Sequence, residues 1–295
     1  LSAISRRADR YVPSTQPIHT VAGLLCTSGG RMPGRLKSVV GTAYGKWKYA
    51  PRIDVEDAGQ LLTLGSEYGG WTFEPSADLE ESKIVSCGFG EDGSFDVEFA
   101  TRFRATVIVV DPTPRAVNHF EAIQQRLGEP SQQSYVDGGK QPATAYDLRG
   151  IRPGSLVMER MALWTENTTL KFFAPRNPEH VSHSIVNYQN EYRSDSPSIE
   201  VPTITLPELL EKYQITSLPL LKIDIEGAEV KVIEDMLQRG LRPRQLMVEF
   251  DEMNFPSQRS KDNAEAMDRQ LREAGYACRY FDHKANFLYV HKSER

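Results

Sequence analysis

The sequence predicts an α/β fold built around a mostly parallel β-sheet. First, short apolar runs rich in β-branched residues alternate with amphipathic segments of about 10–15 residues, which is typical of repeated βαβ units. Second, these runs are continuously apolar, as expected for parallel strands that helices cover on both faces. Third, the chain ends in two apolar runs, 277–281 and 286–291, whose short connection predicts an antiparallel hairpin.

The first regular stretch of the chain predicts two strands and two helices. Residues 83–87 are a short apolar run and predict a buried strand. A helix is predicted over 94–103, where phenylalanines at every fourth position form one stripe. Residues 105–111 predict a second buried strand. Thr113 and the proline after it predict the start of a helix, which Gly128 ends.

The middle of the chain alternates between loops and strand patterns. Residues 128–154 predict a loop, whereas 155–164 and 168–173 predict two strands on either side of a polar turn. Residues 174–200 are polar and contain several prolines, and they predict a long irregular loop of the kind that often carries function. A capping box that starts at Thr205 predicts a short helix.

The last third of the chain repeats the alternation of strand and helix. Apolar spacing, glycines and prolines define two further strands and two further helices. We expect the strands at 218–225 and 244–250, and the helices at 227–239 and 260–274. In an open parallel sheet, ligands bind at the carboxyl ends of the strands, so we expect the functional residues there.

Length and composition limit the classes of protein. We expect an N-terminal extension or cap over 1–64, rich in proline and glycine, and one domain over 65–295. The formal net charge of −5 argues against a nucleic-acid partner, because phosphate-binding surfaces are usually basic. No apolar run approaches the ~20 residues of a membrane helix, so no membrane partner is expected. The cysteines are widely spaced and form neither a metal motif nor a disulfide framework, which favours a reducing, cytoplasmic setting.

A glycine motif follows the first buried strand. Gly88, Gly90 and Gly93 form G-x-G-x-x-G between a strand and a helix. Such glycines let a ligand approach the backbone, and the free N–H groups of a helix start favour an anion. The anion is a pyrophosphate or the carboxylate of a methionine-like ligand; the alternative is a tight turn that only packs the helix on the sheet. Asp111, which ends the next strand, is suited to bind ribose hydroxyls.

Carboxylates that follow later strands are the candidates for chemistry. Asp224 ends the strand in KIDIEGAEV, and Glu226 follows on the same side; a helix cap or an ion pair with Lys222 is the structural alternative. His183, on the long loop, is a candidate to take a proton from a substrate hydroxyl. Asp224 and Glu249 are two suitable ligands for a divalent cation, but no third ligand accompanies them, so no metal is expected.

Several segments together resemble the FkbM-like family of class I S-adenosylmethionine-dependent methyltransferases. LLKIDIEGAEVKVIEDML (220–237) is similar to the family's Lys-x-Asp-x-Glu-Gly-x-Glu block, and VPTITLPELL (201–210) before it also resembles the family. VVDPTP (109–114) and GSEYGGW (65–71), with the glycine loop, resemble a branch that has a longer N-terminal part. The resemblance covers about residues 60–291.

One departure from the family concerns the cofactor site. Ser86 stands where many members carry an aspartate close to the methionine end of the cofactor. Glu91 or Asp92 is the expected replacement. With the glycine motif and the resemblance taken together, the residues expected to bind the cofactor are Ser86, Gly88, Gly90, Asp92, Gly93, Asp111 and Thr113.

The resemblance implies a Rossmann-like, seven-stranded sheet with an antiparallel last strand. It also implies S-adenosylmethionine as cofactor and O-methylation of a sugar, polyketide or other small molecule, so the expected partner is a small-molecule or glycan acceptor. A base would take the hydroxyl proton, and Asp224, Glu226 and His183 are the candidates in that order. An NAD-dependent oxidoreductase also accounts for the glycine loop and Asp111, but not for the block around Asp224 or the closing hairpin. A catalytically degenerate cofactor-binding module, which Ser86 favours, is the second alternative.

Overall fold

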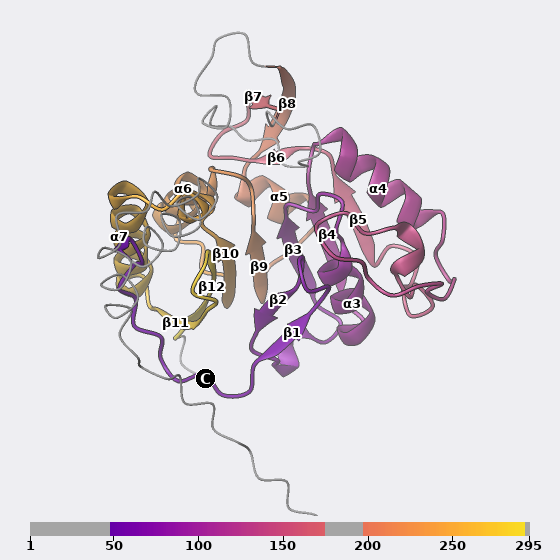
Figure 1. The fold of residues 1–295 in the computed structure, drawn as a ribbon, viewed down its shortest axis with the longest axis horizontal. Helices are drawn as coiled ribbons and strands as arrows, with labels where there is room; N and C mark the ends of the chain where they lie inside the picture. The colour runs from indigo at the N-terminus through magenta and orange to yellow at the C-terminus, as the bar shows by residue number, and fades with distance from the viewer. Residues whose placement is uncertain (1–47, 175–196, 293–295) are drawn as a thin grey trace, which may run out of the picture. The chain divides into compact units, whose positions relative to one another are not determined.

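A mostly parallel, seven-stranded β-sheet forms the centre of the part of the chain that the computed structural model describes, residues 48–174 and 197–292 (Figure 1). Strand β12 is antiparallel to both of its neighbours, whereas the other pairs of adjacent strands are parallel. The predicted fold class and the closing hairpin are therefore confirmed. In order across the sheet, the strands are β11 (Tyr276–Phe281), β12 (Asn286–His291), β10 (Gln245–Glu249), β9 (Leu220–Ile223), β3 (Lys83–Cys87), β4 (Thr106–Val110) and β5 (Leu156–Glu159).

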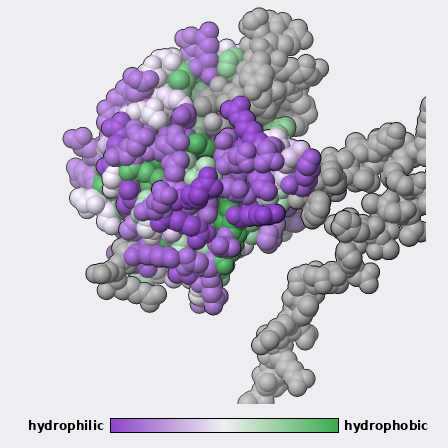
Figure 2. All heavy atoms as spheres, turned by 90° about the vertical axis from the view of Figure 1, so that its left-hand side faces the viewer, coloured by the Kyte–Doolittle hydropathy of each residue, from purple (hydrophilic) through white to green (hydrophobic). Residues whose placement is uncertain are grey.

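Helices cover both faces of this sheet. Successive strand residues point to opposite sides, so both faces carry apolar side chains that the helices bury. Ile84 and Val107 face α3 and α4, whereas Val85 and Ile108 face α5, α6 and α7. Figure 2 shows the side of the molecule that carries α7, where hydrophilic side chains predominate. The helix bounds are Ser94–Phe103 (α3), Pro114–Gln124 (α4), Leu206–Lys212 (α5), Glu229–Gln238 (α6) and Gln258–Glu273 (α7).

A second, three-stranded sheet corrects two predictions. The predicted strand 155–164 is divided between β5 in the central sheet and β6 (Ala162–Leu163), which belongs to the second sheet in the order β6-β8-β7. β7 (Thr169–Phe173) agrees with its prediction. β8 (Ser198–Ile204) begins inside the predicted loop 174–200 and pairs antiparallel with β7. Glu200 and Pro202 weaken the strand pattern of β8 in the sequence, and its pairing overrides these weak local preferences.

A short hairpin that the sequence did not predict packs against α3. β1 (Leu62–Leu64), in the predicted N-terminal extension, pairs antiparallel with β2 (Trp71–Phe73), and residues 65–70 connect them. The ring of Phe73 meets that of Phe95 in α3 at a centroid distance of 6.1 Å. This contact fixes the hairpin and its glycine-rich loop at the sheet face that carries α3.

The remaining helical segments are short. Within the described residues, 3-10 helices occupy Ala77–Leu79, Ala143–Ala145 and Asp251–Asn254. In the same parts of the chain, every helix is too short or too polar to traverse a lipid bilayer.

Candidate active site

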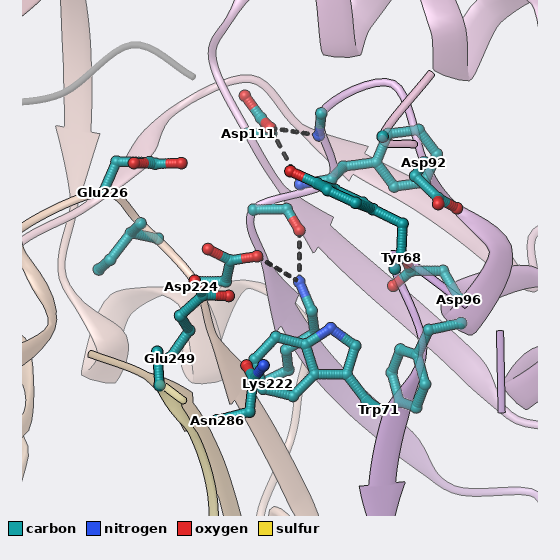
Figure 3. Close-up of a pocket in the computed structure, with 18 of the residues that line it drawn as sticks. Tyr68, Trp71, Asp92, Asp96, Asp111, Lys222, Asp224, Glu226, Glu249 and Asn286 are labelled. Carbon is teal, nitrogen blue, oxygen red and sulfur yellow. Dashed lines mark hydrogen bonds and ion pairs between the residues drawn. The ribbon is translucent and has the colours of Figure 1, made fainter. Parts of the chain in front are cut away.

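A cavity of about 830 Å³ opens where β3, β4, β9 and β10 end (Figure 3). This volume lies within the ~300–1,000 Å³ that is usual for ligand pockets. Residues 88–92 after β3, 111–113 after β4 and 224–226 after β9 line it, together with Glu249 of β10. The structure thus gathers the glycine loop and most of the candidate residues around one cavity.

The three glycines of the motif differ in what they do. Gly88 has φ +83°, and a Cβ there would lie 1.8 Å from the carbonyl oxygen of Asp224, so only glycine lets this loop lie against the end of β9. Gly90 has φ +56°, and a Cβ there would meet no atom within 4 Å. Gly93 does not line the cavity, and a Cβ there would lie 2.3 Å from the ring of Phe89. Gly93 is therefore a packing residue.

Asp111 holds the glycine loop in place. Its Oδ2 accepts hydrogen bonds from the backbone N–H groups of Phe89 and Gly90, each at 3.0 Å. Its Oδ1 accepts from the backbone N–H and the hydroxyl of Thr113 at 2.9 and 2.7 Å. Thr113 is the N-cap residue of α4, as predicted, but its hydroxyl bonds to Asp111 instead of capping the helix. The carboxylate predicted to bind ribose is therefore also a link between two loops at the cavity.

Lys222 is a buried cation at the base of the cavity. Its ammonium donates hydrogen bonds to the carbonyl oxygens of Cys87 and Gly88. It lies 3.8 Å from Oδ2 of Asp224, so the ion pair that was the structural alternative for this carboxylate is present, and it lies 4.9 Å from the centroid of the Trp71 ring. These contacts offset the cost of burying the charge, because a buried charge needs partners on all sides.

Asp224 and Glu249 form a pair of carboxyl groups that point toward one another in the cavity (Figure 3). Burial raises the pKa of Asp224, and the ammonium of Lys222 opposes this shift. Burial and the nearby Asp224 raise the pKa of Glu249 to about 7, while a hydrogen bond from Asn254 opposes the shift. A carboxyl pair with raised pKa values can accept and hold a proton near neutral pH.

The loop after Asp224 has a strained backbone. Glu226 has φ +55°, which is unusual for a residue with a side chain, and Gly227 follows with φ +97°. The buried Glu229 carboxyl accepts hydrogen bonds from the N–H groups of Ile225 and Gly227 and so secures this turn at the start of α6. Glu229 thus takes the capping role that was the alternative for Glu226, and Glu226 lines the cavity. Strain of this kind is often stored at functional sites.

Other candidate residues have different positions. Ser86 is fully buried and lies behind the lining of the cavity. Asp92 lines the cavity, where its carboxylate accepts hydrogen bonds from the Ser66 hydroxyl and the Ser94 N–H at 2.6 and 3.0 Å. His183 lies outside the described residues. Within the described residues, no three His, Cys, Asp or Glu side chains are arranged to hold a metal ion.

Several lining residues were missed by sequence reasoning. Tyr68 and Trp71 come from the segment GSEYGGWTF, whose glycines and aromatic residues were the available signal. Asp96, in the first turn of α3, is buried and also lines the cavity. The second sheet adds an apolar wall, which sequence pattern alone did not connect to the site. Its residues are Ala162, Leu163, Leu170 and Phe172.

Comparison with known families agrees with this arrangement. The family model described as methyltransferase FkbM domain matches residues 65–278, which is more than half of the chain. The match includes the glycine loop, Asp111 and the segment from Lys222 to Glu229. No curated protein shows significant similarity to this chain.

Proposed function

Because the chain belongs to the methyltransferase FkbM family, we propose that it is an S-adenosylmethionine-dependent enzyme that methylates a hydroxyl group of a small molecule or glycan. The observation that carries this proposal is one cavity into which the glycine loop, Asp111, Asp224 and Glu226 all project from the ends of parallel strands. Ligands of open α/β sheets bind at this edge.

The charge of the cavity supports S-adenosylmethionine over a nicotinamide dinucleotide. S-adenosylmethionine carries a positive sulfonium and a positive ammonium, whereas the dinucleotide carries negative phosphates. Among the described lining residues, two are basic, Lys222 and Lys284, and nine are acidic. The acidic residues are Glu67, Glu91, Asp92, Asp96, Asp111, Asp224, Glu226, Glu249 and Asp282. Such a lining attracts cations and repels a pyrophosphate.

The residues around the glycine loop are suited to hold the cofactor. Gly88 and Gly90 leave room for close approach to the backbone, and Asp111 keeps that loop rigid. We infer that the Asp111 carboxylate, together with this loop, binds the sugar of the cofactor. When bound, the cofactor supplies a methyl group already activated on a sulfonium, so the protein mainly has to align the acceptor with it. Alignment of this kind contributes about 7–11 kcal/mol in favourable cases.

Asp224 is the residue best suited to take the proton of the acceptor hydroxyl. Its side chain is one-third exposed, at 33%, and lines the cavity. In the proposed step, a carboxylate oxygen of Asp224 accepts the hydroxyl proton, and Glu249 opposite it can share that proton. Lys222 favours the ionised form of Asp224 that this role requires. General-base catalysis contributes about 10²–10⁴ to the rate. Glu226 is the second candidate, and His183 is the third.

The apolar wall from the second sheet supports an acceptor that has both an apolar face and hydroxyl groups. Leu170 and Phe172 offer the apolar contact, and Asn286, whose Oδ1 accepts no hydrogen bond from the described residues, offers a polar one. Ligand pockets commonly combine an apolar lining with a few polar groups that orient the ligand.

We further infer a reducing, cytoplasmic setting. Cys87 and Cys278 are both buried free thiols, and burial raises the pKa of each to about 12, which keeps them protonated and inert. Fractionation of cells that contain the protein tests this inference, and recovery of the protein in a secreted fraction with these cysteines oxidised would contradict it.

Two experiments test the proposed activity. Calorimetric titration with S-adenosylmethionine and with NAD should show one saturable site for the first ligand; binding of NAD without S-adenosylmethionine would support the oxidoreductase instead. Incubation with a methyl-labelled donor and a small-molecule extract should then give a labelled product. The amount of labelled product should be lower with the Asp224→Asn variant. A chain that binds the donor but labels no acceptor would match the degenerate module.

A further inference from the structure

Asp96 is a buried carboxyl group that faces the cavity with unused hydrogen-bonding capacity. Its exposed fraction is 1%, and Oδ1 accepts no hydrogen bond from the described residues. Figure 3 shows its carboxyl group directed from α3 toward the interior of the site, which Trp71 and Lys222 also line. A buried carboxylate oxygen without a partner is costly, so its position calls for a ligand that supplies a donor.

The charge of Asp96 is only partly balanced by the groups around it, so an additional cation would be favourable there. Burial raises the pKa of Asp96 to about 6, and Asp92 adds to that shift. Lys222 opposes it, but its ammonium is already bonded to two carbonyl oxygens and paired with Asp224. The Ser86 hydroxyl lies near enough to favour ionisation of Asp96, although it does not meet hydrogen-bond geometry. The other titratable neighbours, Cys87 and Tyr146, have raised pKa values and carry no charge near neutral pH.

The other acids at this end of the cavity have protein partners. Glu91 forms an ion pair with Arg115 at 3.5 Å, although its Oε2, like Oδ1 of Asp96, accepts no hydrogen bond from the described residues. Both carboxylate oxygens of Asp92 accept hydrogen bonds, one from the Ser66 hydroxyl and one from the Ser94 N–H. Among the described residues, Asp96 therefore combines an open acceptor with the absence of an ion pair, on the helix that follows the glycine loop.

We propose that Asp96 binds a primary ammonium group, that of the amino-acid end of the cofactor. This inference rests on the proposed function. It assigns to Asp96 the acidic contact for which the sequence suggested Glu91 or Asp92. An ammonium has three donors and a full positive charge, so it can satisfy Oδ1 of Asp96 and neutralise the buried carboxylate in a single contact.

Two ligands that differ in this group test the proposal on the whole protein. S-adenosylhomocysteine has the amino-acid end, whereas 5′-methylthioadenosine lacks it. With Asp96→Asn, calorimetry should show about 10–100-fold weaker binding of S-adenosylhomocysteine, the loss expected for one charged hydrogen bond. Binding of 5′-methylthioadenosine should change less than about twofold. Asp92→Asn is the matched control, because each oxygen of Asp92 already accepts one hydrogen bond from the protein; it should affect both ligands equally.

A measurement on the unmodified protein keeps the proposal testable if Asp96→Asn does not fold. Binding of S-adenosylhomocysteine near pH 6 should release protons, seen as a dependence of the binding heat on the buffer, because the ammonium drives ionisation of Asp96. Binding of 5′-methylthioadenosine should release fewer protons. If both ligands release equal numbers of protons, or if Asp96→Asn weakens the binding of both ligands equally, the role of Asp96 is overturned but the proposed function is not. Failure of the unmodified protein to bind either ligand would overturn the proposed function as well.

Discussion

The ammonium nitrogen of Lys222 lies 3.8 Å from Oδ2 of Asp224, and this ion pair crosses from the protein interior into the cavity. The Lys222 side chain is 4% exposed and that of Asp224 is 33% exposed. The cation is therefore shielded from water while its partner can meet a substrate. Through this pair, the buried Lys222 lowers the pKa of Asp224, which faces the cavity.

Removal of the Lys222 charge should move the pH dependence of catalysis. Lys222 lowers the pKa of Asp224, so Lys222→Met should raise it. Since the base must be deprotonated, the acidic limb of the kcat/KM profile should shift to higher pH. Loss of the buried hydrogen bonds should also destabilise the fold by about 1–3 kcal/mol. Lys284→Met, at another position in the cavity lining, is the control. An unchanged acidic limb in a folded Lys222→Met protein would contradict this role.

Replacement of Asp224 should separate catalysis from cofactor binding. Asp224→Asn keeps the shape of the side chain but removes the proton acceptor. We expect kcat to fall by about 10²–10⁴, while the Kd for S-adenosylmethionine changes little. Glu226→Gln serves as the comparison, because Glu226 lines the same cavity. If Glu226→Gln causes the large loss and Asp224→Asn does not, the base is Glu226.

The two glycines at the cavity should respond differently to alanine. Gly90→Ala should cost about 1–2 kcal/mol for the left-handed backbone alone, because no atom lies within 4 Å of the added Cβ. Gly88→Ala has the same backbone cost plus a contact of 1.8 Å with the backbone of Asp224, which should add about 1–3 kcal/mol. Urea unfolding measures both. Equal stability of the two variants would show that the approach of Gly88 to β9 is looser than described.

Asp111 should matter for stability as well as for binding. Asp111→Asn replaces one oxygen by a donor that faces backbone N–H groups, so the free energy of unfolding should fall by about 1.5–3 kcal/mol. Thr113→Val removes only the hydroxyl bond and should cost about 0.5–1.5 kcal/mol. Cofactor affinity should fall in Asp111→Asn as the glycine loop loosens. Weaker cofactor binding with unchanged stability would mean that the carboxylate serves the ligand alone.

The ligand-free protein should lose stability as pH rises through neutrality. Burial raises the pKa of Glu229 from 4.5 to about 8, so the folded state holds a proton that the unfolded state releases. Stability from this group is therefore present below about pH 4.5 and lost progressively toward pH 8. Glu249 and Asp96, with pKa values raised to about 7 and about 6, act in the same direction. Glu229→Gln should flatten the curve in urea unfolding at several pH values; an unchanged slope would contradict this assignment.

The central strands were predictable because the apolar residues in their segments indicate burial. The short, mostly apolar segments at 83–87 and the apolar centre of 244–250 favour buried strands, and the structure has β3 and β10 there within one residue of the predicted bounds. β8 was not predictable in the same way. Its proline and exposed positions resemble a loop, and its pairing partner β7 lies in a separate segment. Such non-local pairing leaves no periodic signal.

Site residues were predictable where backbone geometry demands a residue type. Gly88 and Asp111 follow strands at the edge where they were expected, and their roles toward a ligand stay predictions. Their contacts with the Asp224 backbone and with the glycine loop were not predicted. Gly93 belongs to the same glycine motif but packs on Phe89. The spacing of the motif does not tell which of its glycines face the ligand. Asp96 shows the opposite limit. An acid in the first turn of a helix is usually solvent-exposed, and only the tertiary packing of α3, which lies against β1, β4 and β5, makes this one buried.

The position of the cofactor can be seen in a crystal structure of the protein with S-adenosylhomocysteine. We expect the ligand in the cavity of about 830 Å³, with its sugar at Asp111, its amino-acid end at Asp96, and its sulfur on the side of Asp224. A ligand bound elsewhere on the protein, or a cavity that stays closed by its own side chains at saturating ligand, would show that this cavity is not the cofactor site.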